Sequence, residues 1–432
     1  MPSSSFISLG KFRRLIAVIR QEGLRAAWFR MRAYFARSPS LDRSPSPDRS
    51  ETYLDTFWQD MARSGAFHTS APPALLQRTR RIAMIGDLNL PQCRKYRVAQ
   101  LAELWGGLGV EYGFSHYMDI PRSVSLLQDA THLMFYRTQN DALMALYLYE
   151  ARRLKLPVLY DLDDPLFSIS AYETYENMKA LPAGMKAHFL REAPKYLGAL
   201  NQADIITVST PGMVDHTKAY TERPVYFRRN FADAETFEAA EAALQNTWNA
   251  PRAPFRVAFA SGSMGHEIDF ALIGEDIAEF LAGGSDRQLV ILGHFDETLL
   301  PQALRGRIES HPFTTYEAYL ATLATVDCAV MPLQDDLFNR CKSAVRVIDA
   351  AAVAVPSLVG TVSDMATLVR DGETGHVLGS GDSWRATLEA LATDRAACTA
   401  MGQAARSDLR ANWGAQAGLP VIEPAVIDWV KG

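Results

Sequence analysis

The chain has 432 residues, of which 48% are hydrophobic and 22% charged, and its formal net charge is −5 at pH 7. This length predicts two or three domains, and the composition is ordinary for a globular protein. The mild negative charge argues against a nucleic-acid partner. The four cysteines are scattered without a CxxC pair and the histidines form no HExxH, so neither a disulfide framework nor a metal site is predicted. We expect a cytoplasmic location.

The first 37 residues are a basic segment in which aromatic and aliphatic residues recur at helical spacing. Its cations are Lys11, Arg13, Arg14, Arg20, Arg25, Arg30, Arg32 and Arg37, against the single acid Glu22. Arginine mixed with Trp28 and Phe29 is typical of a helix on anionic lipid, whereas packing on protein is the alternative. An anionic membrane surface is thus a candidate partner of residues 10–37, on the inner face of the cytoplasmic membrane. Arginines interrupt every apolar run here, so no export signal is predicted.

Residues 38–79 are predicted to be a Ser/Pro-rich linker with a short helix. From residue 80 onward, short apolar strands alternate with helices, such as those at 95–109 and 266–283. Strands are predicted at 80–89, 131–139, 156–164, 203–210, 255–263, 287–295, 327–334 and 355–363. This rhythm predicts two α/β domains with doubly wound parallel sheets, at 80–228 and 229–412. A tail, residues 413–432, is expected to pack back on the first domain.

Three carboxylates stand at the end of the strand 156–164. Ligands of open parallel sheets bind beyond the carboxyl ends of the strands, so Asp163 and Asp164 are expected to face the second domain as catalytic residues, one of them accepting a proton. Asp161, still inside the strand, is expected to pair with Arg97 or Arg137. All three of these charged residues are candidates for the surface that faces the other domain. The alternative is a turn at Asp164 with carboxylates bound to backbone N–H groups.

Two further sites follow strands of the second domain. Gly262 and Ser263 precede a predicted helix and would suit a phosphate, although a tight turn also needs glycine. His266 would contact that ligand or cap the helix. Lys342 and Asp349 share a helical face with Arg346, which suits a diphosphate near Lys342 and a sugar diol at Asp349; the alternative is a solvated face with an ion pair.

Several segments resemble nucleotide-sugar glycosyltransferases of the GT-B fold, most closely glycosyltransferase family 4. The resemblance covers roughly residues 80–415 and is strongest in "MPLQDDLFNRCKSAVRVIDAAAVAVPSLVGTVSDMATLVRDGETGHVL", which is similar to a subgroup with an "fN..KS..r..E" signature. The segments "ALNQADIITVSTPGMVDHTKAY" and "VYFRRNFADAETF" also resemble family elements. The resemblance implies two Rossmann-like domains facing across a cleft, preceded here by the basic helical extension.

The resemblance also implies roles for residues. Lys342 would hold the donor diphosphate, Asn339 and Ser343 would border the sugar or phosphate, and Asp349 would bind the ribose. Gly262 and Ser263 would form the phosphate loop. The chain departs from the commoner pattern in three ways: Cys341 replaces the first of two glutamates, the usual Arg and Lys are missing from "SGSMGHEID", and the first domain has "DLDD" where His-Asp is common.

The expected function is sugar transfer from a nucleotide sugar to a polysaccharide, lipid-linked or other cell-envelope acceptor. The resemblance implies that transfer needs no metal or other cofactor and retains configuration at the sugar carbon. Two alternatives stay open: a weakly active or inactive relative that acts as a binding or scaffold protein, and a sugar-nucleotide epimerase on the same fold.

Overall fold

The computed structural model describes residues 15–16, 18–20, 23–25, 27–28, 30–32, 79–247, 254–262, 264–296, 301–415 and 420–432. The predicted linker and its short helix, apart from residue 79, lie outside these residues. So do Ser263 and much of the basic segment, of which the described residues between 15 and 32 are helical.

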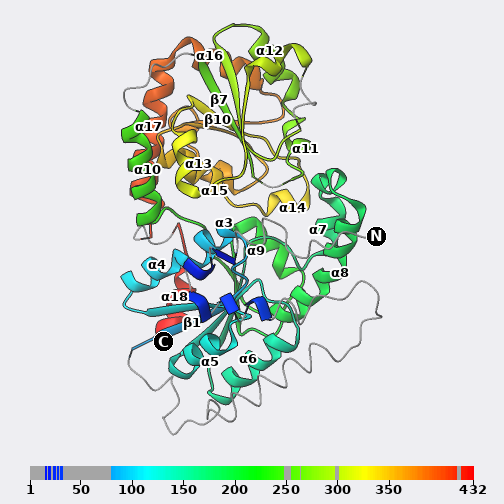
Figure 1. Ribbon diagram of the computed structural model, residues 1–432, viewed down its shortest axis with the longest axis vertical. Helices are drawn as coiled ribbons and strands as arrows, with labels where there is room; N and C mark the ends of the chain where they lie inside the picture. Colours follow the sequence, from blue (N-terminus) through cyan, green and yellow to red (C-terminus); the bar gives the residue numbers. More distant parts are fainter. Residues whose placement is uncertain are drawn as a thin grey trace.

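The described strands form two six-stranded sheets in which every neighbouring pair is parallel. The first sheet has the order β2-β1-β3-β4-β5-β6 and the second β12-β11-β10-β7-β8-β9. The strands of the first sheet are β1 (Arg81–Gly86), β2 (Glu111–His116), β3 (His132–Tyr136), β4 (Val158–Leu162), β5 (Ile205–Val208) and β6 (Val225–Phe227). Those of the second are β7 (Phe255–Gly262), β8 (Arg287–Gly293), β9 (Ile308–His311), β10 (Cys328–Met331), β11 (Ser357–Gly360) and β12 (Gly375–Leu378). The predicted pair of doubly wound domains is confirmed (Figure 1).

Helices cover both faces of each sheet (Figure 1). The first domain contains α3 (Pro91–Cys93), the π-helix η2 (Arg94–Ala99), α4 (Leu101–Gly107), α5 (Ile120–Asp129), α6 (Ala142–Arg153), α7 (Ile169–Thr174), η3 (Glu176–Ala180), α8 (Ala183–Leu200), α9 (Pro211–Lys218) and α18 (Pro424–Lys431). The second contains α10 (Ala234–Thr247), α11 (Glu267–Phe270), α12 (Gly274–Ala282), η5 (Gln302–Arg307), α13 (Tyr316–Leu323), α14 (Leu337–Arg340), α15 (Val345–Ala352), η6 (Asp364–Leu368), α16 (Trp384–Thr393) and α17 (Arg395–Asn412). None of the helices in the described ranges has both the length and the apolar character needed to cross a bilayer.

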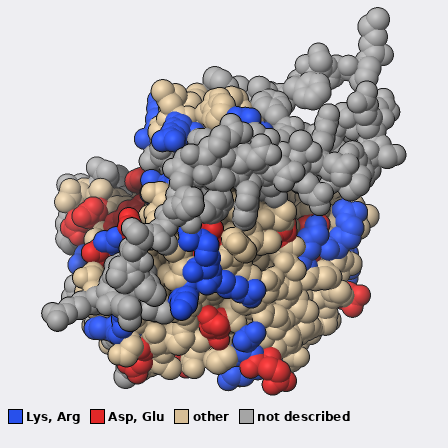
Figure 2. All heavy atoms as spheres, turned by 90° about the horizontal axis from the view of Figure 1, so that it is seen from below, with Lys and Arg blue, Asp and Glu red and all other residues tan. Residues whose placement is uncertain are grey.

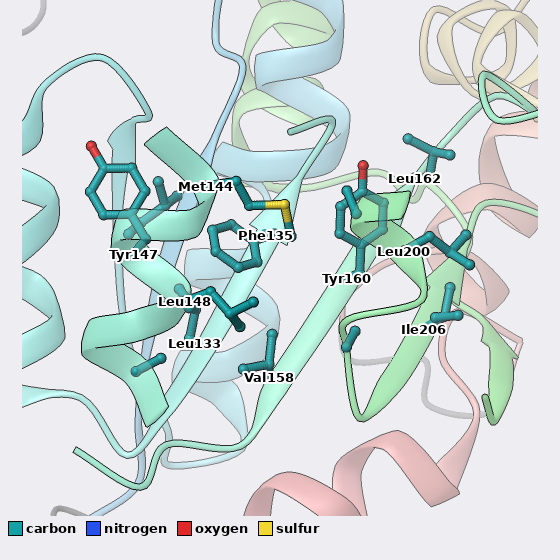
Figure 3. Packing of buried hydrophobic residues seen from close by; sticks show 14 of the residues in the cluster. Leu133, Phe135, Met144, Tyr147, Leu148, Val158, Tyr160, Leu162, Leu200 and Ile206 are labelled. Carbon is teal, nitrogen blue, oxygen red and sulfur yellow. The ribbon is translucent and has the colours of Figure 1, made fainter. Parts of the chain in front are cut away.

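Alternating side chains of the central strands build the core of the first domain. Leu133 and Phe135 of β3 lie beside Tyr160 of β4 and pack against Met144 and Leu148 of α6 (Figure 3). The intervening residues of the same strands belong to a second buried cluster on the opposite face. A strand that is buried on both faces has a continuous run of apolar residues, and this pattern is why these strands could be predicted from the sequence.

The structure corrects the sequence-based elements in three places. The strands β2, β6, β9 and β12 were not predicted. The residues of β2, β9 and β12 are partly exposed and include polar side chains, and β6 has only three residues. The predicted helix at 95–109 is a π-helical turn followed by α4. The predicted helix at 266–283 is divided into α11 and α12, so only one helical turn follows β7 at once.

The chain crosses between the domains twice, and the two crossing segments lie side by side. The Ala232 amide donates to the Trp413 carbonyl at 2.8 Å, and the Arg229 amide donates to the Val421 carbonyl at 2.7 Å. Beyond this point Val426 and Val430 of α18 are buried against the first sheet. The C-terminal helix is therefore part of the first domain's packing (Figure 1).

Candidate active site at the domain interface

The two carboxylates that follow β4 share one arginine. Arg137 donates from Nε to Asp163 Oδ1 at 2.5 Å and from Nη2 to Asp164 Oδ2 at 2.7 Å, and the Tyr136 hydroxyl donates to Asp163 Oδ2 at 3.1 Å. The side chain of Asp163 is 13% exposed and that of Asp164 is 30% exposed. Arg137 directly follows β3 and has a φ of 49°, a left-handed conformation that is uncommon outside glycine and often marks functional sites.

These contacts shift the two carboxyl groups in opposite directions. Burial opposes ionisation of Asp163, but the attraction and hydrogen bond of Arg137 outweigh it and lower the pKa of Asp163. Burial and the neighbouring charge of Asp163 raise the pKa of Asp164 despite Arg137 and Lys342. Two carboxyl groups with divergent pKa values suit different roles, and Asp164 is the better proton acceptor.

Asp161 and Arg97 are fully buried, so neither side chain is exposed on the surface that was predicted to face the other domain. Asp161 accepts hydrogen bonds from Arg97 at 2.5 and 3.0 Å, from Arg228 at 2.9 Å and from Thr207 at 2.6 Å. The predicted pairing of Asp161 with Arg97 is thus present. The physical reason for the burial is strand alternation, which turns Asp161 toward the face covered by η2.

The π-helix η2 presents Lys95 and Tyr96 to the second domain. The hydroxyls of Tyr96 and of Tyr316, the latter at 2.8 Å, donate to Asp349 Oδ1. Lys95 pairs with Asp233 at 2.9 Å. Burial raises the pKa of Asp349 to about 6, although the tyrosine hydroxyls and Lys95 oppose the rise. Asp349, which was predicted to bind ribose, therefore accepts hydrogen bonds from tyrosine hydroxyls of both domains.

The turn after β7 is shaped by two glycines in the left-handed region. Gly262 has a φ of 68° with open space where a Cβ would be, and its neighbour Ser263 lies outside the described residues. A Cβ on Gly265 would stand 3.0 Å from the Asn177 carbonyl oxygen of the first domain. Because α11 is a single turn, the helix dipole predicted to favour a phosphate here is weak.

His266 and Asn339, both predicted to contact the donor, meet at the buried carboxylate of Asp269. His266 Nδ1 lies 2.8 Å from Asp269 Oδ2, and Asn339 Nδ2 donates to Asp269 Oδ1 at 3.3 Å. Asn177 of the first domain donates to Asp269 Oδ2 at 2.6 Å. Ser343 accepts a hydrogen bond from Asn230 at 3.0 Å, which links the segment before α15 to the segment after β6.

Lys342 of the second domain lies close enough to Asp164 for its charge to oppose the raised pKa of that carboxyl group. Its Nζ lies 5.5 Å from the ring centroids of Tyr175 and Phe338. Burial alone would lower the pKa of Lys342, but Tyr175, Asp164 and Asp269 outweigh it and the pKa is raised, so the side chain stays charged at neutral pH. Arg346, in the first turn of α15, donates to the Ala260 carbonyl at 3.3 Å. The two cations together are a suitable site for a diphosphate.

The sequence reasoning missed Tyr96, Tyr316, Arg228 and Asp269. Only Asp269 had a usable signal, because it stands one helical turn after His266. The other three are polar residues of elements whose partners lie far away in the sequence. In the described residues, the predicted site residues at the ends of β4, β7 and β10 do come together at the domain interface, apart from Arg97 and Asp161.

No profile of a known protein family and no curated protein sequence matches the chain. Among solved structures, the chain is similar to a sucrose-phosphate synthase from Thermosynechococcus elongatus, with a TM-score of 0.50 at 13% identity over 78% of this chain and 96% of that one. It is also similar to HepE from Anabaena, solved with UDP and glucose, with a TM-score of 0.52 at 12% identity over 81% and 99%. WaaG, a glycosyltransferase involved in lipopolysaccharide biosynthesis, gives a TM-score of 0.50 at 11% identity over 81% and 100%. These likenesses show that the chain has the GT-B fold.

Proposed function

We propose that the protein is a glycosyltransferase that moves a sugar from a nucleotide sugar to a cell-envelope glycan or lipid-linked acceptor. The observation that carries the proposal is that Lys342 of the second domain and Asp164 of the first lie near each other at the domain interface. They are close enough for the charge of each to shift the pKa of the other. Ligands of parallel α/β domains bind at such strand ends. The GT-B structures that resemble the chain include HepE with UDP and glucose, which supports a nucleotide-sugar donor.

The donor is proposed to lie along α15 and the turn after β7. Lys342 and Arg346 would hold the diphosphate, with the backbone at Gly262 and Ser263 approaching its oxygens. Ser343 would border the phosphate and Asp349 would bind the ribose. Asp349 accepts a hydrogen bond from the Tyr96 hydroxyl of the first domain, so ribose binding at Asp349 would replace that hydrogen bond between the domains.

The proposed chemistry is electrostatic catalysis with a proton acceptor. The leaving nucleoside diphosphate gains negative charge as the sugar departs, and preorganised cations at Lys342 and Arg346 stabilise that charge. Asp164 accepts the proton of the attacking hydroxyl, while Asp163 and Arg137 hold it in place. We propose that this transfer is metal-independent and retaining, so that the hydroxyl attacks the sugar carbon on the same face from which the diphosphate leaves.

Purified protein incubated with UDP-glucose, UDP-N-acetylglucosamine and GDP-mannose, each with and without glycan acceptors, is expected to release nucleotide only when an acceptor is present. The measurement is chromatography of the released nucleotide, with NMR of the product to read the configuration at the transferred carbon. Release without any acceptor would indicate an epimerase, and binding without turnover a scaffold protein. Absence of binding by all three in millimolar titrations would contradict the proposal.

We propose that the basic N-terminal segment attaches the enzyme to an anionic membrane surface on the cytoplasmic side. Leu24, Trp28 and Met31 follow at helical spacing and are 73%, 46% and 39% exposed, and Arg25 and Arg32 are exposed beside them. An exposed apolar stripe flanked by arginine is typical of interfacial helices. On the end of the molecule seen in Figure 2, basic and acidic side chains are interspersed among the visible described residues, so we assign the attachment to the segment itself.

The double variant Leu24→Asp/Trp28→Asp is expected to lose at least about tenfold in binding to vesicles with anionic lipid. Each change removes an exposed apolar side chain whose burial in the lipid would contribute about 1.5–3 kcal/mol to binding. Co-sedimentation with vesicles of phosphatidylglycerol and phosphatidylcholine measures the loss. The matched control is Phe313→Asp, which alters a side chain of the second domain that is 61% exposed. Equal sedimentation of the double variant and the native chain would assign the segment to protein packing.

A further inference from the structure

Asp269 is a fully buried carboxylate that receives four hydrogen bonds or close polar contacts. Its partners are Asn177 Nδ2 at 2.6 Å, His266 Nδ1 at 2.8 Å, the Gln334 amide at 2.9 Å and Asn339 Nδ2 at 3.3 Å. Burial would raise the pKa of Asp269, but the contacts to His266, Gln334 and Asn177 outweigh it and lower the pKa. An ionised carboxylate with this many donors is rigidly held, and it orients the groups around it.

The carboxylate determines which nitrogen of His266 carries the proton. Burial and the nearby Lys342 lower the pKa of His266 to about 4, so the ring is neutral at pH 7. A neutral imidazole has one N–H, and Nδ1 has two polar neighbours: Asp269 Oδ2 at 2.8 Å and the amide nitrogen of Asn177 at 3.4 Å. The carboxylate contact is the shorter, and Asn177 already donates to Asp269 at 2.6 Å, so we assign the N–H of the ring to Nδ1. Nε2 is left as a hydrogen-bond acceptor, and a ligand group that meets it must donate.

This requirement separates hydroxyl groups from phosphate. The oxygens of a diphosphate are acceptors and would meet a lone pair at Nε2, whereas Lys342 and Arg346 offer N–H donors for them. A sugar hydroxyl can donate to Nε2. The ligand of His266 is therefore a hydroxyl group.

The order of residues along the site indicates which hydroxyl it is. Arg346 and Asp349 belong to α15, and Lys342 stands three residues before the start of that helix, so the predicted shared helical face holds only for Arg346 and Asp349. These three residues are proposed to contact ribose and diphosphate. Asp269, the partner of His266, bonds Asn339 and the Gln334 amide, which precede Lys342 in the chain, whereas Asp349 bonds Tyr96 and Tyr316. His266 thus belongs to the end of the site remote from Asp349, where a nucleotide sugar carries the sugar to be transferred.

Asp269 also ties this end of the site to the first domain. Asn177, which is 1% exposed, belongs to η3 and donates to Asp269 across the interface. The same carboxylate holds Asn339, which was predicted to border the sugar. The Asp269 side chain therefore positions the His266 ring and the Asn339 amide, and it also accepts the hydrogen bond from Asn177 of the first domain.

We propose that Asp269 is a positioning residue that fixes His266 as a hydrogen-bond acceptor for a hydroxyl group of the transferred sugar. This inference rests on the proposed function for the identity of the ligand, but the state of the His266 ring is independent of it.

The first test measures the ring in the native full-length chain without nucleotide. Nitrogen-15 NMR of histidine side chains, with the His266 signals assigned by their loss in His266→Phe, is expected to show protonated Nδ1 and unprotonated Nε2. In Asp269→Asn the new amide can donate to Nδ1, and the proton is expected to move to Nε2. A native ring protonated at Nε2 would overturn the inference.

The second test compares UDP-glucose with UDP, and GDP-mannose with GDP, by titration calorimetry. For the sugar nucleotide that binds, Asp269→Asn and His266→Phe are each expected to weaken binding about tenfold, the equivalent of one lost hydrogen bond. Binding of the matching diphosphate is expected to change less than twofold. Equal weakening of both ligands would place the hydroxyl on the ribose and overturn the sugar assignment.

Asp327→Asn is the matched control, because it removes a carboxylate of the same domain that is 8% exposed and pairs with Arg395 at 2.8 Å, away from the site. It is expected to lower the melting temperature while leaving the ratio of the two affinities unchanged. If Asp269→Asn does not fold, His266→Phe carries the binding test. If the native chain binds no nucleotide at all, the proposed function fails, and the NMR measurement still decides whether Asp269 fixes the ring.

Discussion

Asp164→Asn is expected to lower kcat about 10²- to 10³-fold and to remove the acidic limb of the pH–rate profile, because an amide cannot accept the proton of the attacking hydroxyl. The pKa of Asp164 is raised by burial and by the charge of Asp163. The native rate should therefore fall as the pH drops through this raised pKa, since the carboxylate is then protonated. Steady-state rates measured between pH 4 and pH 9 with saturating donor provide the test.

Asp163→Asn is the matched comparison, because it removes the neighbouring charge and leaves Asp164 in place. Without that charge the pKa of Asp164 falls, and the acidic limb is expected to move to lower pH. Asp163 also accepts hydrogen bonds from Arg137 and from the Tyr136 hydroxyl, so its loss is expected to misplace Arg137 and to lower the rate somewhat. If Asp164→Asn kept the acidic limb of the pH–rate profile, the proton transfer would be assigned to another group. The same would follow if that limb did not move in Asp163→Asn.

Lys342→Met is expected to lower kcat about 10²- to 10³-fold, comparable to the loss of one preorganised donor at a developing negative charge. Methionine keeps the length and the apolar contacts beside Tyr175 and Phe338, so the change is mainly one of charge. Affinity for nucleoside diphosphate should fall with it, because the diphosphate loses a cation. Initial rates and calorimetric titration with UDP or GDP measure the two effects.

Arg340→Ala serves as the control for this variant. Arg340 stands two positions earlier, is 54% exposed and pairs with Asp335 at 2.7 Å, so its loss removes a nearby cation outside the site. Exposed ion pairs of this kind contribute little to stability, and the rate of the variant should stay near the native value. Similar losses in both variants would point to a general effect of charge on this segment, and an active Lys342→Met would remove Lys342 from catalysis.

The sequence by itself determined the two-domain α/β fold. Strands such as those around Leu133 and Tyr160 are buried on both faces, and their continuous apolar runs distinguish them from helices of amphipathic pattern. The half-exposed strands β2, β6, β9 and β12 lack that signal, which is why they were missed. The sequence also located Asp163, Asp164 and Lys342 at strand ends, since the carboxyl ends of parallel strands gather at one edge of a sheet.

Only the tertiary structure decided which of these groups contact one another. Tyr96 and Asp349 are 253 positions apart and Asn177 and Asp269 are 92 apart, yet each pair forms a hydrogen bond across the domain interface. Local patterns hold no information on such pairs, because the contacts depend on how two separately folded sheets dock. For the same reason, the sequence pattern did not distinguish the role of Asp163 from that of Asp164. Their division into an ion-paired carboxylate and a proton acceptor follows from the position of Arg137 and from burial, which exist only after the domain has folded.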